Sequence, residues 1–350
     1  EVNSAWEKAE KLVAGQKFKV NYMRAKAISN LGGPMCRPST ESMEVPDDTY
    51  GDGANAIAAV RMLEKLSKAE APFFLSVGFS KPHLPFVAPK KYWDLYSKED
   101  IELAAFQNRA KNSADIAYKG NSLGEISSYS DIPEQGPLST EKQKELIHGY
   151  MAAISYMDTQ VGFLLDKLEK LGLQDNTVVI LWGDHGFHLG DHGLWTKHTN
   201  FEQAVRSPLI ILSPQGFSAS KNNTPTEFVD IFPTLCELTN LDIPAHLPGK
   251  SLVPLMEDPN ISLRFAALSQ YPRGGRRMGY TLRSERFRYV KWLQMNYKNG
   301  ERTGRLIATE LYDYENDPLE TVNQSSNPYY KAVIKAFENE FKKRNIAQLN

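Results

Sequence analysis

The chain lacks cysteine-rich, strongly basic and long apolar segments. Its 350 residues include two cysteines, Cys36 and Cys236, which are too few for a disulfide framework or a thiolate metal site and leave the redox compartment open. No apolar run approaches the roughly 20 residues that span a bilayer, so no membrane span is predicted. The formal net charge is −1 without a long Lys/Arg run. Because a phosphate-tracking surface needs clustered positive charge, a general nucleic-acid binder is excluded.

The remaining composition is that of an ordinary globular protein. Apolar residues make up 41% and charged residues 24% of the chain, and its length allows one large domain or two smaller ones. The polar start, Glu1 to Lys8, has no initiator Met and no signal peptide. We therefore expect it to come from the interior of a longer protein.

Hydrophobic periodicity predicts alternating helices and strands. Helices are expected over 55–68 and 141–171, and buried strands over 72–78, 178–181 and 207–212. Residues 105–140, rich in Ser, Asn, Gly and Pro, are predicted to form a long surface excursion. The alternation predicts an α/β fold with a largely parallel central sheet and helices on both faces. Short strands beyond residue 262, with a helix near 330–344, predict a small antiparallel subdomain, which divides the chain into domains 1–261 and 262–350.

The segment 178–197 is the strongest candidate for chemistry. An apolar strand runs into Asp184 and His185, which are framed by Gly183 and Gly186. Ligands of α/β sheets collect beyond the carboxyl ends of strands, and glycines let the backbone approach a bound ion. Oxygen and nitrogen ligands from this pair can reach one divalent cation. The alternative is a capping Asp beside a solvated His.

Three further residues of this segment carry competing interpretations. His188 and His192 are four residues apart, but the glycines at 186, 190 and 193 argue against the helix that a zinc motif needs. We interpret both histidines as loop-shaping residues or residues behind the site. Lys197 can hold an anionic group as a compact charge, or it is an ordinary surface lysine.

A second loop, from Phe79 to Phe86, carries Lys81 and His83 between two prolines. In a parallel sheet this loop and Asp184 would share one rim. The reference pKa of histidine, about 6.5, suits His83 for contacting an oxyanion or protonating a leaving oxygen. A packing or capping role for His83 remains the alternative.

Five motifs, in order along the chain, resemble those of one enzyme family. They are Lys81-Pro-His-Leu-Pro85, the segment from Asp184-His185-Gly186 to Trp195-Thr196-Lys197, Val229-Asp-Ile-Phe-Pro-Thr-Leu235, Ser269-Gln-Tyr-Pro-Arg273 and Glu310-Leu-Tyr-Asp313 with Asp317-Pro318. Together they resemble the sulfatases of the alkaline-phosphatase-like superfamily, and most of all the iduronate-2-sulfatase-like branch. The resemblance covers the chain from about Val45 onward.

The resemblance implies a fold, a metal and a reaction. It implies an α/β sandwich with a smaller C-terminal sheet, one bound Ca²⁺ and hydrolysis of a sulfate ester. The expected substrate is a sulfated carbohydrate such as a 2-O-sulfated uronic acid. By motif match, Asp184 and His185 are implied metal ligands, whereas His83 and Lys197 are implied catalytic contacts of the sulfate. Lys81, His192 and Arg273 are implied substrate-binding residues. The family implies a periplasmic, secreted or lysosomal location.

The match fails at the nucleophile. Such sulfatases make a formylglycine from Cys-x-Pro-Ser-Arg, and they carry an upstream Asp-Asp pair. Cys36-Arg-Pro-Ser-Thr40 resembles the first motif, but its fifth residue is Thr40 and the Asp47-Asp48 pair follows rather than precedes it. We therefore assign no nucleophile. The expectation is an incomplete, inactive fragment, with a complementing N-terminal chain as a partner.

The sequence allows alternatives for the role of one arginine cluster and for the function of the chain. Arg273, Arg276 and Arg277 could grip a sugar carboxylate or a second sulfate, or they form a solvated basic turn. The alternative functions are a phosphodiesterase or phosphonate hydrolase of the same superfamily and a non-catalytic metal-binding module.

Overall fold

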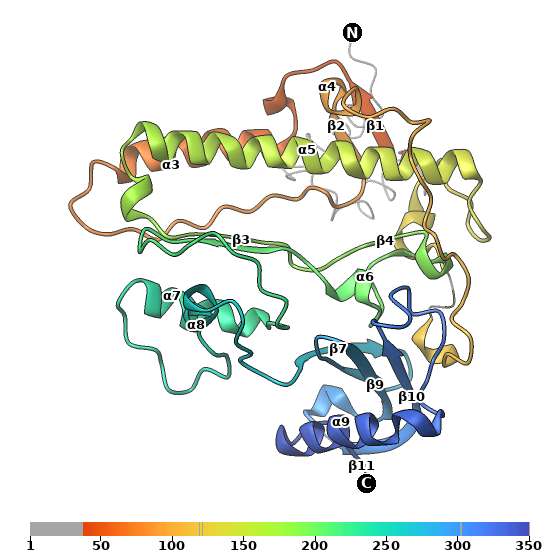
Figure 1. The fold of residues 1–350 in the computed structure, drawn as a ribbon. Helices are drawn as coiled ribbons and strands as arrows, with labels where there is room; N and C mark the ends of the chain where they lie inside the picture. Colours follow the sequence, from red (N-terminus) through yellow and green to blue (C-terminus); the bar gives the residue numbers. More distant parts are fainter. Residues whose placement is uncertain (1–37, 119, 121, 302, 350) are drawn as a thin grey trace. The chain divides into compact units, whose positions relative to one another are not determined.

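The computed structural model describes residues 38–118, 120, 122–301 and 303–349 (Figure 1). The chain divides into two compact units that interleave along the sequence. The first unit comprises Glu1–Ala105, Asn121–Asn176 and Leu194–Thr196, and the second comprises Phe106–Gly120, Thr177–Gly193 and Lys197–Asn350. The domain boundary at residue 261 stays a prediction.

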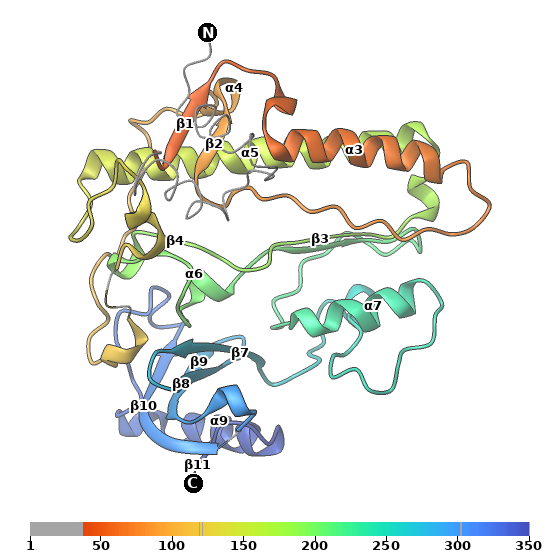
Figure 2. The ribbon, with the colours of Figure 1, turned by 180° about the vertical axis from the view of Figure 1, so that it is seen from behind.

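The first unit is built on two long helices. Its elements are β1 (Thr40–Met43), η2 (Asp47–Thr49), α3 (Gly51–Leu66), β2 (Phe86–Pro89), α4 (Lys90–Trp93), η4 (Gly124–Ser128), α5 (Thr140–Lys170), η5 (Gln174–Asn176) and β5 (Trp195–Thr196). Both predicted helices are thereby confirmed. Figures 1 and 2 show α3 lying along α5 in both views. Strands β1 and β2 pair in parallel beside α5.

Local signals explain why α5 begins and ends where it does. The Ser139 hydroxyl accepts a hydrogen bond from the Lys142 N–H, which satisfies one of the free donors at the helix start. The helix ends before Gly172, whose φ of 66° suits glycine. Small residues bring neighbouring elements close to the helix: a Cβ on Gly149 would lie 2.8 Å from the Trp93 ring. The buried Tyr156 hydroxyl also links α5 to α3, since it accepts from the Gly53 N–H and donates to the Asp47 carbonyl.

Two expectations for this half of the sequence are wrong. Residues 72–78 form no regular strand, because among the described residues no strand pairs with them, and Phe74 is 79% exposed. The segment 105–140 is not simply a surface excursion. Although it is mostly irregular, it buries aromatic and apolar side chains, with Tyr118 in the second unit and Ile126 and Tyr129 in the first.

The second unit contains a strand pair, short helices and a C-terminal sheet. Its elements are η3 (Asp115–Ala117), β3 (Val179–Trp182), β4 (His188–Leu189), η6 (Asp191–Gly193), α6 (Glu202–Val205), β6 (Leu209–Leu212), η7 (Phe228–Asp230), α7 (Ile231–Leu238), α8 (Val253–Glu257), β7 (Ala267–Arg273), β8 (Arg277–Arg283), β9 (Phe287–Gln294), η8 (Tyr297–Asn299), β10 (Thr303–Asp313), η9 (Pro328–Tyr330), α9 (Lys331–Lys343) and β11 (Gln348–Leu349).

Strands β3 and β6 appear where the sequence predicts them, but their pairing differs from the prediction. They run antiparallel, with Val179 opposite Leu212 and Trp182 opposite Leu209. They are also less buried than expected, since Trp182 is 46% exposed. Apolar periodicity identifies a strand without fixing the direction of its partner, which accounts for the error.

The C-terminal antiparallel module is confirmed. Its strands lie in the order β11-β10-β9-β8-β7, and β7 to β10 pair antiparallel. Helix α9 packs its buried Phe337 and Phe341 against Tyr289 of β9, at ring-centroid separations of 5.6 and 6.2 Å. Among the described residues, no helix is long and apolar enough to cross a bilayer.

A buried carboxylate closes the end of this sheet. Asp313, the last residue of β10, is 1% exposed and accepts two hydrogen bonds of 2.7 Å from the Arg286 guanidinium. The Tyr330 hydroxyl donates a third at 3.0 Å and thereby ties the segment before α9 to the sheet. The bonds from Arg286 lower the pKa of Asp313 to about 2.

This pKa predicts how acid destabilises the chain. A carboxylate with a depressed pKa stabilises the fold above its unfolded pKa of about 3.9, and the effect is lost as pH falls towards 2. Asp313→Asn should therefore lower the melting temperature at pH 7 and reduce the further loss between pH 4 and pH 2, as measured by circular dichroism. The control is Glu315→Gln, because its 64% exposed carboxylate pairs with the same arginine and should contribute little. Equal effects of the two substitutions would contradict the assignment.

Candidate functional site

The loop with Lys81 and His83 is anchored by Asp52, a residue in the first turn of α3. The buried Asp52 carboxylate accepts the backbone N–H groups of Ser80 and Lys81 at 2.8 and 2.7 Å. Within the loop, the Lys81 ammonium donates to the carbonyls of Pro85, at 2.6 Å, and His83, at 3.2 Å. Burial lowers the pKa of Lys81 to about 8. Lys81 therefore closes the loop on itself, which favours a structural role over the predicted substrate contact.

His83 is held in a defined tautomer. Its Nδ1 lies 2.8 Å from the Leu84 carbonyl, and since a carbonyl can only accept, Nδ1 carries a proton. Its Nε2 lies 3.6 Å from Oε1 of Glu125 in η4. Protonation of a leaving oxygen by His83 requires a proton on this Nε2, because Nδ1 faces the carbonyl.

In the second unit, Asp184 and His185 follow β3 on a loop that is tied to the segment before β6. The Gly183 N–H donates to the Pro208 carbonyl at 3.1 Å and the Gly186 N–H donates to Ala204 at 3.0 Å. A Cβ on Gly186 would lie 2.1 Å from the Gln203 carbonyl oxygen, so only glycine allows this approach. Gly186 thus allows a close approach of two backbone segments, whereas the predicted approach to a bound ion stays a prediction.

The two side chains place their potential metal-ligand atoms close together. His185 Nδ1 lies 2.7 Å from the Gly186 carbonyl, which leaves Nε2 as the atom that can bind a metal. Nε2 lies 3.7 Å from Oδ2 of Asp184, whose side chain is 86% exposed. A carboxylate oxygen and an imidazole nitrogen thus lie side by side at the strand end.

These donors make only part of a metal shell. Calcium takes 6–8 oxygen ligands in general. No group of three His, Cys, Asp or Glu side chains within 38–118, 120, 122–301 and 303–349 is arranged to hold an ion. The described residues therefore do not by themselves fit a complete calcium site.

The sequence offers two other candidates, Cys36 and the Asp47-Asp48 pair. Cys36 lies outside the described residues. The Asp47 carboxylate accepts from the Tyr92 hydroxyl at 2.8 Å and from the Lys91 ammonium at 3.0 Å, which gives it structural partners. That Asp47-Asp48 is not the family's metal-binding pair stays a prediction.

His188 and His192 are both buried inside the second unit. His188 bonds Asp191 through Nδ1 and the Thr199 hydroxyl through Nε2, the latter at 2.7 Å. His192 is 2% exposed and stacks on Phe201, with ring centroids 4.3 Å apart. These positions agree with a loop-shaping role. They do not favour the predicted contact of His192 with a saccharide, because its imidazole is covered.

Lys197 and Arg273 both lie in the second unit. Lys197 is half-buried, and its carbonyl accepts from the Thr199 N–H at 2.9 Å. Arg273, at the end of β7, donates to the carbonyls of Ile116, Ala117 and His198 at 2.8 to 3.0 Å. Three donors of its guanidinium are thus engaged by backbone.

The predicted site residues fall into both units. Lys81 and His83 belong to the first unit. The second unit contains the others, namely Asp184, His185, His192, Lys197 and Arg273. Convergence of the two groups on one cation stays a prediction. Residues that sequence reasoning missed are Asp52, Glu125 and Asp191, because their roles arise from contacts rather than from motifs.

Comparison with known proteins identifies the family. The sulfatase family model matches residues 7–241, and the model for the C-terminal part of N-sulphoglucosamine sulphohydrolase matches residues 190–347. The chain belongs to the sulfatase family. It is 31% identical to human iduronate 2-sulfatase over 348 residues, which cover 80% of this chain and 63% of that enzyme. This member thus spans less than two thirds of the length of its human relative.

Solved structures agree with this family assignment. The phosphonate monoester hydrolase of Agrobacterium radiobacter matches with 25% identity and a TM-score of 0.68, covering 86% of this chain and 62% of that one. A 2-O GAG sulfatase matches with 20% identity and a TM-score of 0.61, covering 96% and 74%. These matches confirm the predicted alkaline-phosphatase-like α/β fold of this sulfatase-family chain.

The Asp52 carboxylate predicts a specific defect. Asp52→Asn replaces an anionic acceptor of two backbone N–H groups and should destabilise the chain by about 1–3 kcal/mol in urea unfolding. It should also speed hydrogen exchange of the Ser80 and Lys81 amides. Asp48→Asn is the matched control, because Asp48 is exposed and surface substitutions usually change stability by less than about 0.5 kcal/mol. Unchanged exchange in Asp52→Asn would show that the loop does not depend on this residue.

Proposed function

We propose that this chain supplies part of a sulfuric ester hydrolase that acts on a sulfated carbohydrate, with a 2-O-sulfated uronic acid as the first substrate to test. The observation that carries the proposal is the Asp184–His185 pair, held beyond β3 with Oδ2 and Nε2 3.7 Å apart, in a chain of the sulfatase family. The similarity to iduronate 2-sulfatase supports the choice of sugar.

The proposed roles follow from the match of these residues to the family's motifs. Asp184 and His185 would provide two ligands of a divalent ion, with Ca²⁺ as the proposed metal, and the bound ion would neutralise sulfate charge. Lys197 would contact the sulfate as a point charge. In the net hydrolysis the sulfuryl group would pass from the sugar oxygen to water. The departing sugar oxygen would take the Nε2 proton of His83, and a proton released by the water would restore it. The attacking group and the remaining ligands are not assigned to any described residue.

One measurement separates this proposal from its alternatives. The polypeptide translated from the complete reading frame should release sulfate from a 2-O-sulfated uronate disaccharide. The 350-residue chain alone should release none from it or from 4-nitrophenyl sulfate, because its described residues lack a complete shell, and a complementing chain would then be needed. Turnover by the 350-residue chain would refute the fragment interpretation. The structural match to phosphonate monoester hydrolase makes phenylphosphonate esters the competing substrates, and exclusive cleavage of these would replace the proposal.

The metal half of the proposal has its own test. Two ligands should bind Ca²⁺ weakly, with a dissociation constant of about 1 mM or above in isothermal titration. Asp184→Asn should weaken this further, whereas Asp175→Asn, at an exposed aspartate in η5, should not. Tight binding that is insensitive to Asp184→Asn would instead favour a non-catalytic metal-binding module with other ligands.

A further inference from the structure

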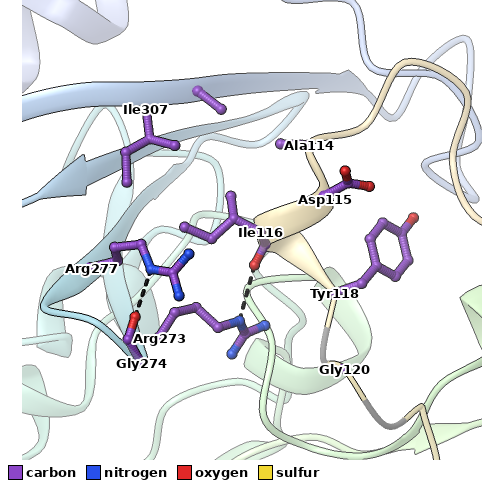
Figure 3. A pocket seen from close by; sticks show the side chains of 10 residues that line it. Ala114, Asp115, Ile116, Tyr118, Gly120, Arg273, Gly274, Arg277 and Ile307 are labelled. Atoms are coloured by element: carbon purple, nitrogen blue, oxygen red, sulfur yellow. Dashed lines mark hydrogen bonds between the residues drawn. The ribbon is translucent and has the colours of Figure 1, made fainter.

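A cavity of about 680 Å³ lies within the second unit. Figure 3 shows it between three segments: η3 with Asp115 and Ile116, the β7–β8 turn with Arg273 and Arg277, and the middle of β10 with Ile307. Its volume is in the range of small-molecule sites, about 300–1,000 Å³.

The strand β10 is adapted to this cavity. The register between β10 and β9 shifts between Leu306 and Ala308, which marks a β-bulge at Ile307. Successive side chains of a regular strand point to opposite faces. Here the consecutive residues Ile307 and Ala308 both line the cavity. Bulges commonly redirect side chains next to binding sites.

The cavity has excess positive charge. Arg273 donates to three neutral carbonyls and lies over the Tyr271 and Trp292 rings, 5.0 and 5.5 Å from their centroids. The Nε–H of Arg277 donates a hydrogen bond to the Gly274 carbonyl at 2.6 Å. Among the described residues, neither guanidinium forms an ion pair. Burial lowers the pKa of Arg273, Tyr271 and the buried Glu310 carboxylate oppose this shift, and the nearby Arg277 lowers the pKa further.

The carboxylate in the lining does not offset this charge. Asp115 accepts a hydrogen bond from Arg109 at 2.8 Å, and its side chain is 97% exposed. Two cations therefore line the cavity, and the anion that acts on them, the buried Glu310, attracts Arg273 without forming an ion pair with it. An anionic ligand would relieve this repulsion, and the planar fork of a guanidinium matches sulfate and carboxylate oxygens.

We infer that this cavity is a subsite for an anionic sugar residue, with Arg277 binding its sulfate or carboxylate group and Ile116 and Ile307 flanking its ring. Arg273 serves as the anchor that joins β7 to η3, because its contacts are with backbone carbonyls. The carbohydrate nature of the ligand rests on the proposed function, whereas the anion preference rests on the two guanidiniums alone.

The neighbouring arginines provide a matched test. Arg276 is exposed and does not line the cavity, whereas Arg277 does. Binding of a disulfated heparin disaccharide to the 350-residue chain would be measured by isothermal titration near 0.1 M salt. Arg277→Ala should weaken binding about tenfold, as expected for loss of a charge-assisted contact, and Arg277→Lys should restore part of it. Arg276→Ala should change binding less than twofold.

Three ligand arms identify the recognised group. They use the disulfated disaccharide, its desulfated form that keeps the carboxylate, and its carboxyl-reduced form that keeps the sulfates. The arm whose binding responds to Arg277→Ala shows which anion is bound. Equal weakening by Arg276→Ala and Arg277→Ala, or none by Arg277→Ala in a variant with an unchanged melting curve, would overturn the inference. Binding is read without turnover, so this outcome is distinguishable from failure of the hydrolase proposal.

Discussion

The hydrogen bonds from two consecutive backbone N–H groups to Asp52 fix the geometry on which the first unit's candidate chemistry depends. A loop stiffened by Pro82 and Pro85 still needs an anchor, because proline removes donors that a strand ladder would use. A carboxylate in the first turn of α3 supplies that anchor, at 2.7 and 2.8 Å. The orientation of His83 therefore depends on a helix that begins about 30 residues earlier.

Much of the secondary structure could be predicted, because helical periodicity is local information. The α5 stripe and the C-terminal strands are examples. The antiparallel pairing of β3 with β6 could not be, since strand direction depends on contacts between residues 27 to 33 positions apart. Residues 72–78 show the converse case: an apolar run reads as a strand, yet a strand also needs a partner with which to share its hydrogen bonds.

The candidate site was predictable where glycines signal a close backbone approach. Gly186 marks the loop of Asp184 and His185 in the sequence, and its missing Cβ is what allows the Gln203 carbonyl nearby. No comparable signal marks Asp52 or Glu125, which look like ordinary helix and loop carboxylates. For Lys81 and His192 the motif marks the segment, but it cannot tell a side chain turned inward from one that reaches a ligand.

The arginines of the β7–β8 turn differ from the other buried arginines of the second unit in how their charge is paired. Burying a guanidinium is costly unless an anion compensates it. The unit follows this rule elsewhere: Arg264 bonds Asp230, Arg283 bonds Glu202 and Arg288 bonds Glu320. Arg273 departs from it in its hydrogen bonds, which go to carbonyls rather than to a carboxylate, while the buried Glu310 attracts it and Arg277 repels it. Carbonyls satisfy its donors without cancelling its charge, so the remaining charge is available to an anion that enters the cavity.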